Sequence, residues 1–159
     1  MLEKKIKSQA QLKKIISALQ KKGRRVVFTN GCFDLLHAGH VEYLQEAKRK
    51  GDILVVAVNS DSSVRRLKGN KRPIVKAQDR TKVIAALESV DYVVVFAEDN
   101  PEKLIRFLRP DILVKGADWN QKDIVGSDLV LGYGGKVHRI NFLKGRSSSN
   151  LIKKIAQNL

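Results

Sequence analysis

Apolar residues recur along the chain with two kinds of spacing. Short unbroken apolar runs are typical of strands buried on both faces of a sheet. Segments whose apolar residues lie three and four positions apart predict amphipathic helices. The expected strands are residues 26–28, 53–58, 92–96, 112–114 and 137–140. The expected helices are residues 8–22, 40–50, 60–67, 79–88, 100–109, a weaker helix closed by Gly134 and Gly135, and 149–157.

Residues at the segment ends support several of these boundaries. Ser8 followed three positions later by Gln11 predicts a capping box, and Gly23 predicts the end of the same helix. Asn100 followed by Pro101 predicts a helix start, with the proline at the first helical position.

Strands that alternate with helices predict an α/β fold. We expect a Rossmann-like, doubly wound, five-stranded parallel sheet in a single domain covering residues 1–159. Within it, residues 1–24 would form an N-terminal helix and residues 25–159 a nucleotide-binding α/β core. In such sheets ligands bind beyond the carboxyl ends of the strands, so the residues after each strand are the candidates for function.

Chain length and apolar runs narrow the class of protein. The 159 residues suffice for one domain with a buried core. No apolar run approaches the ~20 residues that a membrane-spanning helix needs, so we expect no membrane partner. The charged start at Met1 is followed by no apolar stretch, so a secretory signal is not expected and the cytoplasm is the expected location. A single cysteine, Cys32, excludes an internal disulfide and a multi-cysteine zinc site.

The charge balance leaves two interpretations open. Lys and Arg number 31 against 16 Asp and Glu, a formal net charge of +15. A basic nucleic-acid-binding module is one interpretation. Lysines spread over helix flanks are the other, and a small polyanionic substrate would be attracted by the same field. The basic clusters are scattered and are not interleaved with aromatic residues, which favours the second interpretation, with no nucleic-acid partner.

The segment after the first expected strand carries the strongest chemistry. His37 and His40 flank Gly39 where a loop turns into a helix. A helix N-terminus offers unpaired N–H groups, and a glycine permits close approach of a phosphate. Two imidazoles there can each donate a hydrogen bond to phosphoryl oxygens. Two unrelated surface histidines, or a zinc site lacking its further ligands, are the alternatives.

This segment resembles a known signature. Gly31-Cys32-Phe33-Asp34 followed by His37-Ala38-Gly39-His40 is similar to the signature of the HxGH nucleotidylyltransferase superfamily. Further segments resemble its heptose 1-phosphate adenylyltransferase branch, the domain found in ADP-heptose synthases. They include Val56 to Asp61, Arg65, Leu67 to Gly69, Arg72-Pro73, Arg80, Val90-Asp91, Asp99, Pro101, Pro110-Asp111, Leu113 to Asp118 and Ser147 to Asn150. The resemblance extends from about residue 30 to the carboxyl terminus.

The resemblance implies an activity and its partners. AMP would pass from ATP to D-glycero-β-D-manno-heptose 1-phosphate, a sugar 1-phosphate, for lipopolysaccharide core synthesis. Magnesium would arrive with ATP, so no metal ligand of the protein is expected. Many relatives carry a fused sugar kinase, for which 159 residues leave no room, so a separate heptose kinase is implied. A homo-oligomer, a dimer, is expected. The alternatives are another acceptor, namely glycerol 3-phosphate, a flavin phosphate or a different sugar phosphate.

The resemblance also assigns site residues. His37 and His40 would stabilise the transition state, with Arg80 and a loop lysine, Lys71 or alternatively Lys68, as electrostatic helpers. Asp34 is expected to be structural. Cys32 is a small residue beside the nucleotide or a packing residue, and Phe142 disfavours glycerol phosphate. Phe33 and Trp119 either belong to the core or flank a base or sugar. The nucleotide-binding set is Gly31, Cys32, Phe33, Gly39, Lys115, Gly116, Asp118, Ser147, Ser148 and Ser149.

Overall fold

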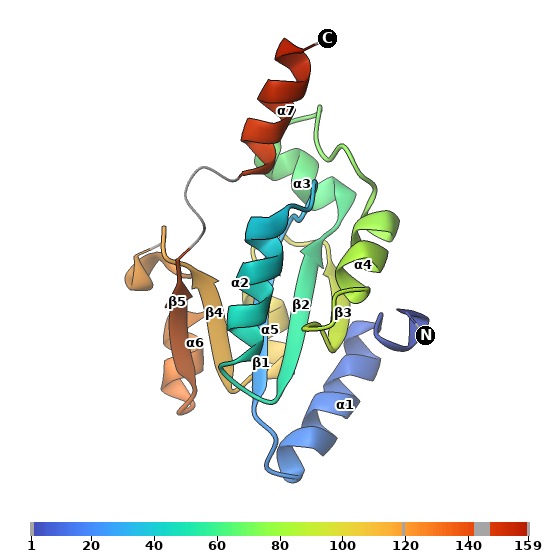
Figure 1. Ribbon diagram of the computed structural model, residues 1–159. Coiled ribbons are helices and arrows are strands. Elements are labelled where there is room, and N and C mark those ends of the chain that lie inside the picture. Colours follow the sequence, from blue (N-terminus) through green and yellow to red (C-terminus); the bar gives the residue numbers. More distant parts are fainter. Residues whose placement is uncertain (1, 119, 142–146, 159) are drawn as a thin grey trace.

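Five parallel strands form the central sheet of the fold. The computed structural model describes residues 2–118, 120–141 and 147–158. Its strands are β1 (Val26–Gly31), β2 (Ile53–Asn59), β3 (Tyr92–Phe96), β4 (Ile112–Gly116) and β5 (Lys136–Ile140), which form one sheet in the order β3-β2-β1-β4-β5 (Figure 1). The Rossmann-like, doubly wound α/β fold expected from the sequence is thereby confirmed.

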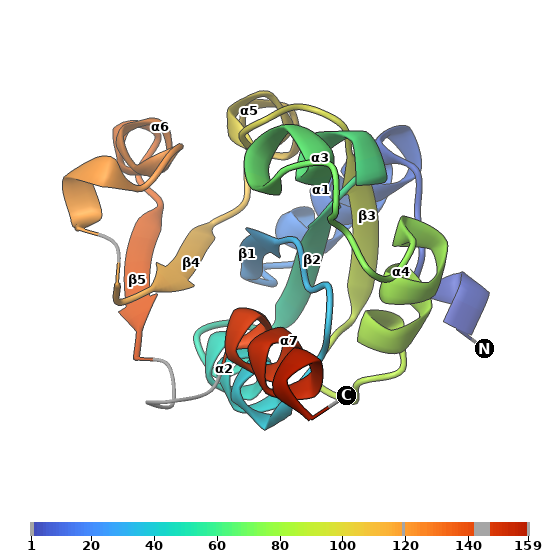
Figure 2. The same cartoon turned by 90° about the horizontal axis from the view of Figure 1, so that it is seen from above.

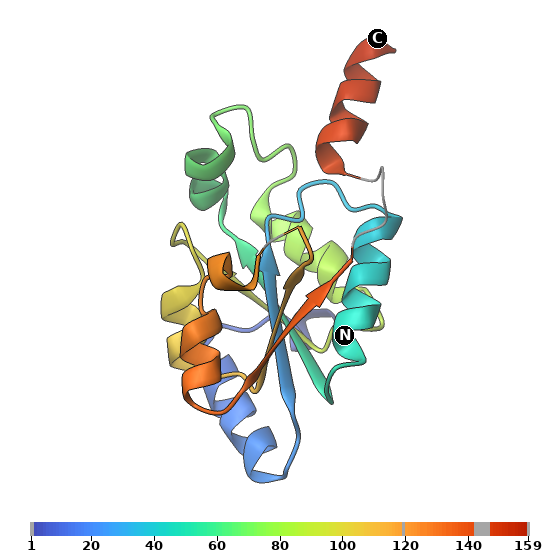
Figure 3. The ribbon, with the colours of Figure 1, turned by 90° about the vertical axis from the view of Figure 1, so that its left-hand side faces the viewer.

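Helices cover both faces of this sheet. They are α1 (Gln9–Lys21), α2 (Ala38–Lys48), α3 (Asp61–Lys68), α4 (Ala77–Ala85), α5 (Glu102–Leu108), α6 (Ser127–Gly132) and α7 (Ser148–Gln157), with 3-10 turns η1 (Leu2–Lys4) and η2 (Gln121–Asp123). Figure 2 shows α2 and α4 on one face and α1, α5 and α6 on the other. Helix α7 projects beyond the carboxyl-terminal edge of the sheet (Figure 3). Within the described residues, every helix is too short or too polar to pass through a bilayer.

Two hydrophobic clusters fill the layers between sheet and helices. Neighbouring residues of β1 point to opposite clusters, as the period of two in a strand requires. Val27 packs with Leu44 of α2 and Ile84 of α4, whereas Phe28 packs with Leu12 of α1 and Leu108 of α5. Burial on both faces explains why β1 and β2 show unbroken apolar runs in the sequence.

The element boundaries follow the sequence closely. The capping box of Ser8 and Gln11 is present at the start of α1. The Asn100 side chain accepts a hydrogen bond from the Glu102 N–H, although Pro101 is the N-cap residue of α5 rather than its first helical residue. Helix α2 begins at Ala38, before the expected His40, because His37 is its N-cap.

Strand pairing is uneven across the sheet. β1 pairs with β2 along its whole length, from Val26↔Ile53 to Gly31↔Val58. β1 pairs with β4 only at Val27↔Ile112 and Phe28↔Leu113. The strand order reverses at this junction, where ligands bind in sheets of this kind. The two carboxyl ends that diverge there border the candidate site.

Candidate active site

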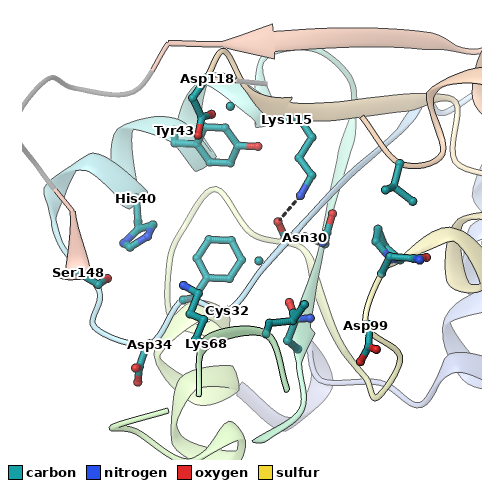
Figure 4. Close-up of a pocket in the computed structure, with 18 of the residues that line it drawn as sticks. Asn30, Cys32, Asp34, His40, Tyr43, Lys68, Asp99, Lys115, Asp118 and Ser148 are labelled. Atoms are coloured by element: carbon teal, nitrogen blue, oxygen red, sulfur yellow. Dashed lines mark hydrogen bonds between the residues drawn. The ribbon is translucent and has the colours of Figure 1, made fainter. Parts of the chain in front are cut away.

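A cavity of about 470 Å³ opens at the carboxyl-terminal edge of the sheet. Its wall is formed by the ends of β1, β2 and β4 and by the first residues of α2 and α7 (Figure 4). The cavity therefore lies where the reversal of strand order places ligands. The wall consists of Asn30, Gly31, Cys32, Phe33, Asp34, His40, Tyr43, Asn59, Leu67, Lys68, Asp99, Asn100, Pro101, Lys115, Gly116, Asp118, Ile124, Val125 and Ser148.

The two predicted histidines lie against each other at the start of α2. Their rings stack with centroids 4.0 Å apart, and His40 lines the cavity. The His37 backbone N–H donates to Nδ1 of His40 at 3.4 Å. Because Nδ1 accepts this bond, the neutral imidazole carries its proton on Nε2. His40 is thus prepared to donate a hydrogen bond through Nε2.

His40 is uncharged at neutral pH. Burial, together with the nearby charges of His37 and Lys68, lowers the pKa of His40 to about 4. In this state the imidazole is a neutral hydrogen-bond donor and not a cation. Its ring also meets the edge of the Phe33 ring, with centroids 5.4 Å apart.

The loop after β1 is tightly built around Phe33. This residue has a φ of 47°, the left-handed region that is costly for a bulky side chain. Its ring lies 3.0 Å from the place where a Cβ on Gly31 would stand. A side chain at position 31 would therefore displace the ring that packs against His40. This close approach explains the glycine of the predicted motif.

Asp34 fastens the same loop to the segment before α4. Its carboxylate accepts from Nε of Arg72 at 2.6 Å and from the N–H groups of Ile74 and Val75 at 2.8 and 2.9 Å. Burial alone would raise the pKa of Asp34, but these donors hold it below its ordinary value. The expected structural role of Asp34 agrees with this geometry.

Arg80 is enclosed by protein. The residue is only 1% exposed. Its guanidinium donates to the carbonyl oxygens of Val75 and Cys32 and to Oδ1 of Asp61. The structure thus places Arg80 behind the Cys32 loop, where it fixes the loop instead of facing the cavity. A positioning role fits this environment better than the direct contact with phosphates that we expected.

The two loop lysines differ in position. Lys68, at the end of α3, lines the cavity and is close enough to lower the pKa of His40. Lys71 is exposed three residues further along the loop. Between the two alternatives, the structure therefore brings Lys68 to the candidate site.

The end of β4 contributes Lys115, Gly116 and Asp118 to the cavity wall. The Lys115 ammonium donates to the carbonyl oxygen of Asn30 at 3.3 Å, across the gap between β4 and β1. Burial lowers the pKa of Lys115 to about 8, partly offset by the nearby Cys32 and Asp118. Lys115 thus remains largely protonated at neutral pH.

Tyr43 ties α2 to both strands beside this gap. Its hydroxyl lies 2.8 Å from Oγ1 of Thr29 and donates to the Val114 carbonyl at 3.3 Å. Burial raises the pKa of Tyr43 above its ordinary value, so the hydroxyl stays neutral. The arrangement fixes the distance between the histidine helix and the end of β4.

The three predicted serines have different positions at the start of α7. Ser147 is the N-cap, and its hydroxyl accepts from the Asn150 N–H. Ser148 lines the cavity and donates to the Leu35 carbonyl at 2.8 Å, which holds α7 against the histidine loop. Ser149 is exposed. Gly39, in the first turn of α2, is buried.

Several cavity residues carried no role in the sequence analysis. Asn30 is the second-to-last residue of β1, Asn59 is the last residue of β2, and Asp99 and Asn100 follow β3. The usable signal was an amide side chain closing an otherwise apolar run. Among the described residues, the buried Oδ1 atom of Asn30 has no hydrogen-bond partner. Buried polar groups without partners are uncommon in folded proteins, which points to a ligand here.

Some predictions fall outside the part of the chain that the structure describes. These concern Trp119, Phe142 and the segment 144–146. Within the described part, no group of three or more His, Cys, Asp or Glu side chains is arranged to hold a metal ion.

Comparison with known proteins identifies the family. The model of the cytidylyltransferase-like family matches residues 28–151. The bifunctional protein HldE of Trichlorobacter lovleyi is 54% identical over 98% of this chain and 32% of its own length, and that of Wolinella succinogenes is 55% identical over 96% and 31%. The chain thus spans about a third of these curated relatives.

A solved structure agrees with the family match. The lipopolysaccharide core biosynthesis protein of Thermoplasma volcanium is 34% identical and superposes with a TM-score of 0.68, covering 77% of this chain and all of its own. The matched family segment contains both histidines, the ends of all five strands and the cavity between them. On this sequence match and this shared fold, the chain belongs to the cytidylyltransferase-like family.

Proposed function

We propose that this protein is an adenylyltransferase that moves AMP from Mg-ATP to D-glycero-β-D-manno-heptose 1-phosphate. A phosphate oxygen of the sugar phosphate attacks the α-phosphorus of ATP. One P–O bond forms there as the bond to the β-phosphate breaks, and pyrophosphate leaves with the electron pair. The products are ADP-heptose and pyrophosphate, and no covalent enzyme intermediate is formed.

Membership in the cytidylyltransferase-like family supports the nucleotidyl transfer. The choice of acceptor is supported by the identity with HldE proteins and by the solved lipopolysaccharide core biosynthesis protein. It is also supported by the adenylyltransferase motifs from Val56 to Asn150. Because the chain spans only a third of its curated relatives, their kinase and any other activity are not transferred to it.

One observation carries the proposal: a neutral histidine donor stands at a helix N-terminus on the cavity wall. His40 has its Nε2 proton available, and Gly39, the glycine expected to permit close approach of a phosphate, lies in the first turn of α2. Phosphoryl transfer requires positioning and stabilisation of charge more than a nucleophilic side chain. His40, supported by the stacked ring of His37, can stabilise charge that develops on the α-phosphate.

The remaining groups fit the nucleotide. Lys68 and Ser148 line the cavity near His40 in the view of Figure 4 and can contact the phosphates. Magnesium belongs to the substrate in this proposal, bound mainly by phosphate oxygens and water. A cytoplasmic location is part of the proposal because ATP is the donor. A dimer and a separate kinase that supplies the sugar phosphate also remain part of it.

The direct test is product identification. The protein is mixed with ATP, magnesium chloride and heptose 1-phosphate, and the products are analysed by mass spectrometry. We expect ADP-heptose and an equal amount of pyrophosphate. Pyrophosphate release is then compared for ATP and CTP with glycerol 3-phosphate, a flavin phosphate and other sugar phosphates as acceptors. Faster turnover of one of these pairs would replace the proposed substrates, and the absence of turnover with every pair would refute the proposed activity.

A further inference from the structure

The proposed reaction brings two anions together. The acceptor attacks through a phosphate group, and its target is the α-phosphate of ATP. Two phosphates close enough to react repel each other strongly in a site that is shielded from water. A cation between the two phosphates would offset that repulsion at the moment of attack.

Few cationic groups line the cavity. Among its described lining residues, the lysines are Lys68 and Lys115, and no arginine is present. His40 is neutral at working pH because burial and neighbouring charges lower its pKa to about 4. Lys68 lies in an exposed stretch near His40, whereas Lys115 is half-buried at the end of β4. Lys115 is therefore the inner cation of the site.

The position of Lys115 matches the meeting point of two substrates. β1 and β4 stop pairing after Phe28 and Leu113, and the Lys115 ammonium spans the resulting gap to the Asn30 carbonyl. In the view of Figure 4 this ammonium points to the middle of the cavity, with His40 on one side and Asp99 on the other. In-line transfer needs the attacking and leaving oxygens on opposite sides of the phosphorus.

The side opposite His40 is suited to a hydroxyl-rich acceptor. Asp99 lies on that side in Figure 4, and the amide side chains of Asn30, Asn59 and Asn100 also line the cavity. The buried Oδ1 of Asn30, which has no partner among the described residues, can accept a hydrogen bond from a sugar hydroxyl. The charged Lys115 lies next to Asn30. It can therefore bind a phosphate attached to a sugar whose hydroxyl contacts Asn30.

We propose that the ammonium group of Lys115 binds the phosphate of the acceptor and holds it against the α-phosphate of the nucleotide. This inference rests on the proposed function. It makes Lys115 the residue that selects an acceptor attacking through a phosphate. The acceptor oxygen still forms the bond to the α-phosphorus, and pyrophosphate still leaves. Lys115 transfers no proton and forms no bond of its own.

The first test separates the two substrates by steady-state kinetics. Removing a charged hydrogen-bond donor should raise the KM for the acceptor roughly 10- to 100-fold in Lys115→Gln. The KM for ATP should change less than about threefold, because the lost contact is made to the acceptor and not to ATP. Lys68→Gln is the matched control, with the same charge change in the same cavity, and we expect it to affect ATP more than the acceptor.

The second test measures how kcat/KM for the acceptor depends on pH. A purely structural role of Lys115 would not change this pH profile. In the free enzyme the pKa of Lys115 is about 8, lowered by burial and raised by Cys32 and Asp118. kcat/KM for the acceptor should therefore fall as pH rises through about 8. Lys115→Arg, whose guanidinium stays charged, should keep a flat profile up to pH 9.5. Tyr43 stays neutral in this range, His40 is already neutral, and Cys32→Ala removes the thiol as an alternative cause.

Each outcome decides the inference. An acceptor-specific KM effect together with the loss of the alkaline fall in Lys115→Arg supports it. An equal rise in both KM values, or an alkaline fall that persists in Lys115→Arg, overturns it. Calorimetric titration of a non-hydrolysable ATP analogue into Lys115→Gln shows whether the variant is folded and still binds nucleotide. If heptose 1-phosphate is no substrate, the proposed function fails, and the same variants are tested with whichever phosphate acceptor the panel identifies.

Discussion

Arg80 and Lys115 are two cations that each donate a hydrogen bond to a backbone carbonyl near the end of β1. Arg80 is enclosed by Val75, Cys32 and Asp61 and reaches no cavity wall of the candidate site. Lys115 donates to the backbone of Asn30 and opens into the cavity. The sequence predicted that Arg80 assists at the phosphates and that Lys115 belongs to the nucleotide-binding set. The structure separates the two by what surrounds each charge.

This difference separates polar groups that stabilise the fold from polar groups that are available to bind a substrate. Where Arg80 and Asp34 have protein partners, they hold the loop in one conformation. Where His40, Lys115 and Asn30 face the cavity, a substrate can become their partner. The first group should therefore affect the free energy of unfolding most, and the second should affect catalysis with little change in stability.

The largest expected effect is the loss of the enclosed cation. Arg80→Met removes the side-chain donor to the Cys32 and Val75 carbonyls, and it removes one of the two donors that Asp61 has among the described residues, leaving the N–H of Ala77. We expect the free energy of unfolding to fall by about 3 kcal/mol, because truncating the buried member of an ion pair leaves its partners short of a hydrogen-bond donor. Urea denaturation measures this. Arg106→Met, whose exposed ion pair with Glu102 lies on α5, is the control and should lose less than about 0.5 kcal/mol. Equal stability of the two variants would contradict the role assigned to Arg80.

His40→Ala tests the group of polar residues that face the cavity. Turnover should fall about 100- to 1,000-fold, as is typical when one donor to a transition-state oxyanion is removed. The unfolding midpoint in urea should stay close to that of the unmodified protein, since His40 is only half-buried. His138→Ala, on β5, is the matched control and should keep normal turnover. Near-normal turnover in His40→Ala would place the chemistry elsewhere.

The pH dependence of stability tests the role of Asp34, one of the polar residues whose partners are protein groups. The pKa of Asp34 is lower in the folded protein than in the unfolded chain, where it is near its ordinary value. The stabilisation is therefore complete above about pH 5 and is lost as pH falls through the folded-state value. Asp34→Asn should cost about 1–3 kcal/mol at pH 7 and reduce the slope of unfolding free energy against pH below 5. An unchanged slope would contradict the lowered pKa, and Asp128→Asn on the exposed face of α6 is the control.

The smallest effect is expected for Cys32. Its backbone carbonyl, not its thiol, accepts the Arg80 hydrogen bond. Cys32→Ala should therefore leave turnover within about threefold and stability within about 1 kcal/mol, as for a small packing residue. Steady-state assays and urea denaturation decide this. A loss of turnover as large as that of His40→Ala would mean that the thiol takes part in the reaction.

Much of the fold could be predicted because local pattern and tertiary structure agree. All five strands were located, since burial on both faces gives unbroken apolar runs. Their polar ends were missed, as at Thr29 to Gly31 and at Lys115 and Gly116. Backbone pairing continues there without regard to side-chain polarity, so the pattern stops before the strand does. These are the residues that enter the cavity.

The site was predictable in composition but not in geometry. The sequence identified His40, Ser148 and Lys115, because all follow strands or begin helices at one edge of the sheet. It could not reveal that Arg80 turns away from the cavity or that Asn30 turns into it. The orientation of Arg80 depends on contacts with residues distant in sequence, such as the carbonyl of Cys32.

The most direct test of the central claim is a crystal structure of the protein with a non-hydrolysable ATP analogue, magnesium and heptose 1-phosphate. The account predicts the α-phosphate within hydrogen-bond distance of Nε2 of His40 and the sugar phosphate on the Lys115 ammonium. Phosphates bound outside this cavity, with His40 and Lys115 in contact with protein alone, would contradict it.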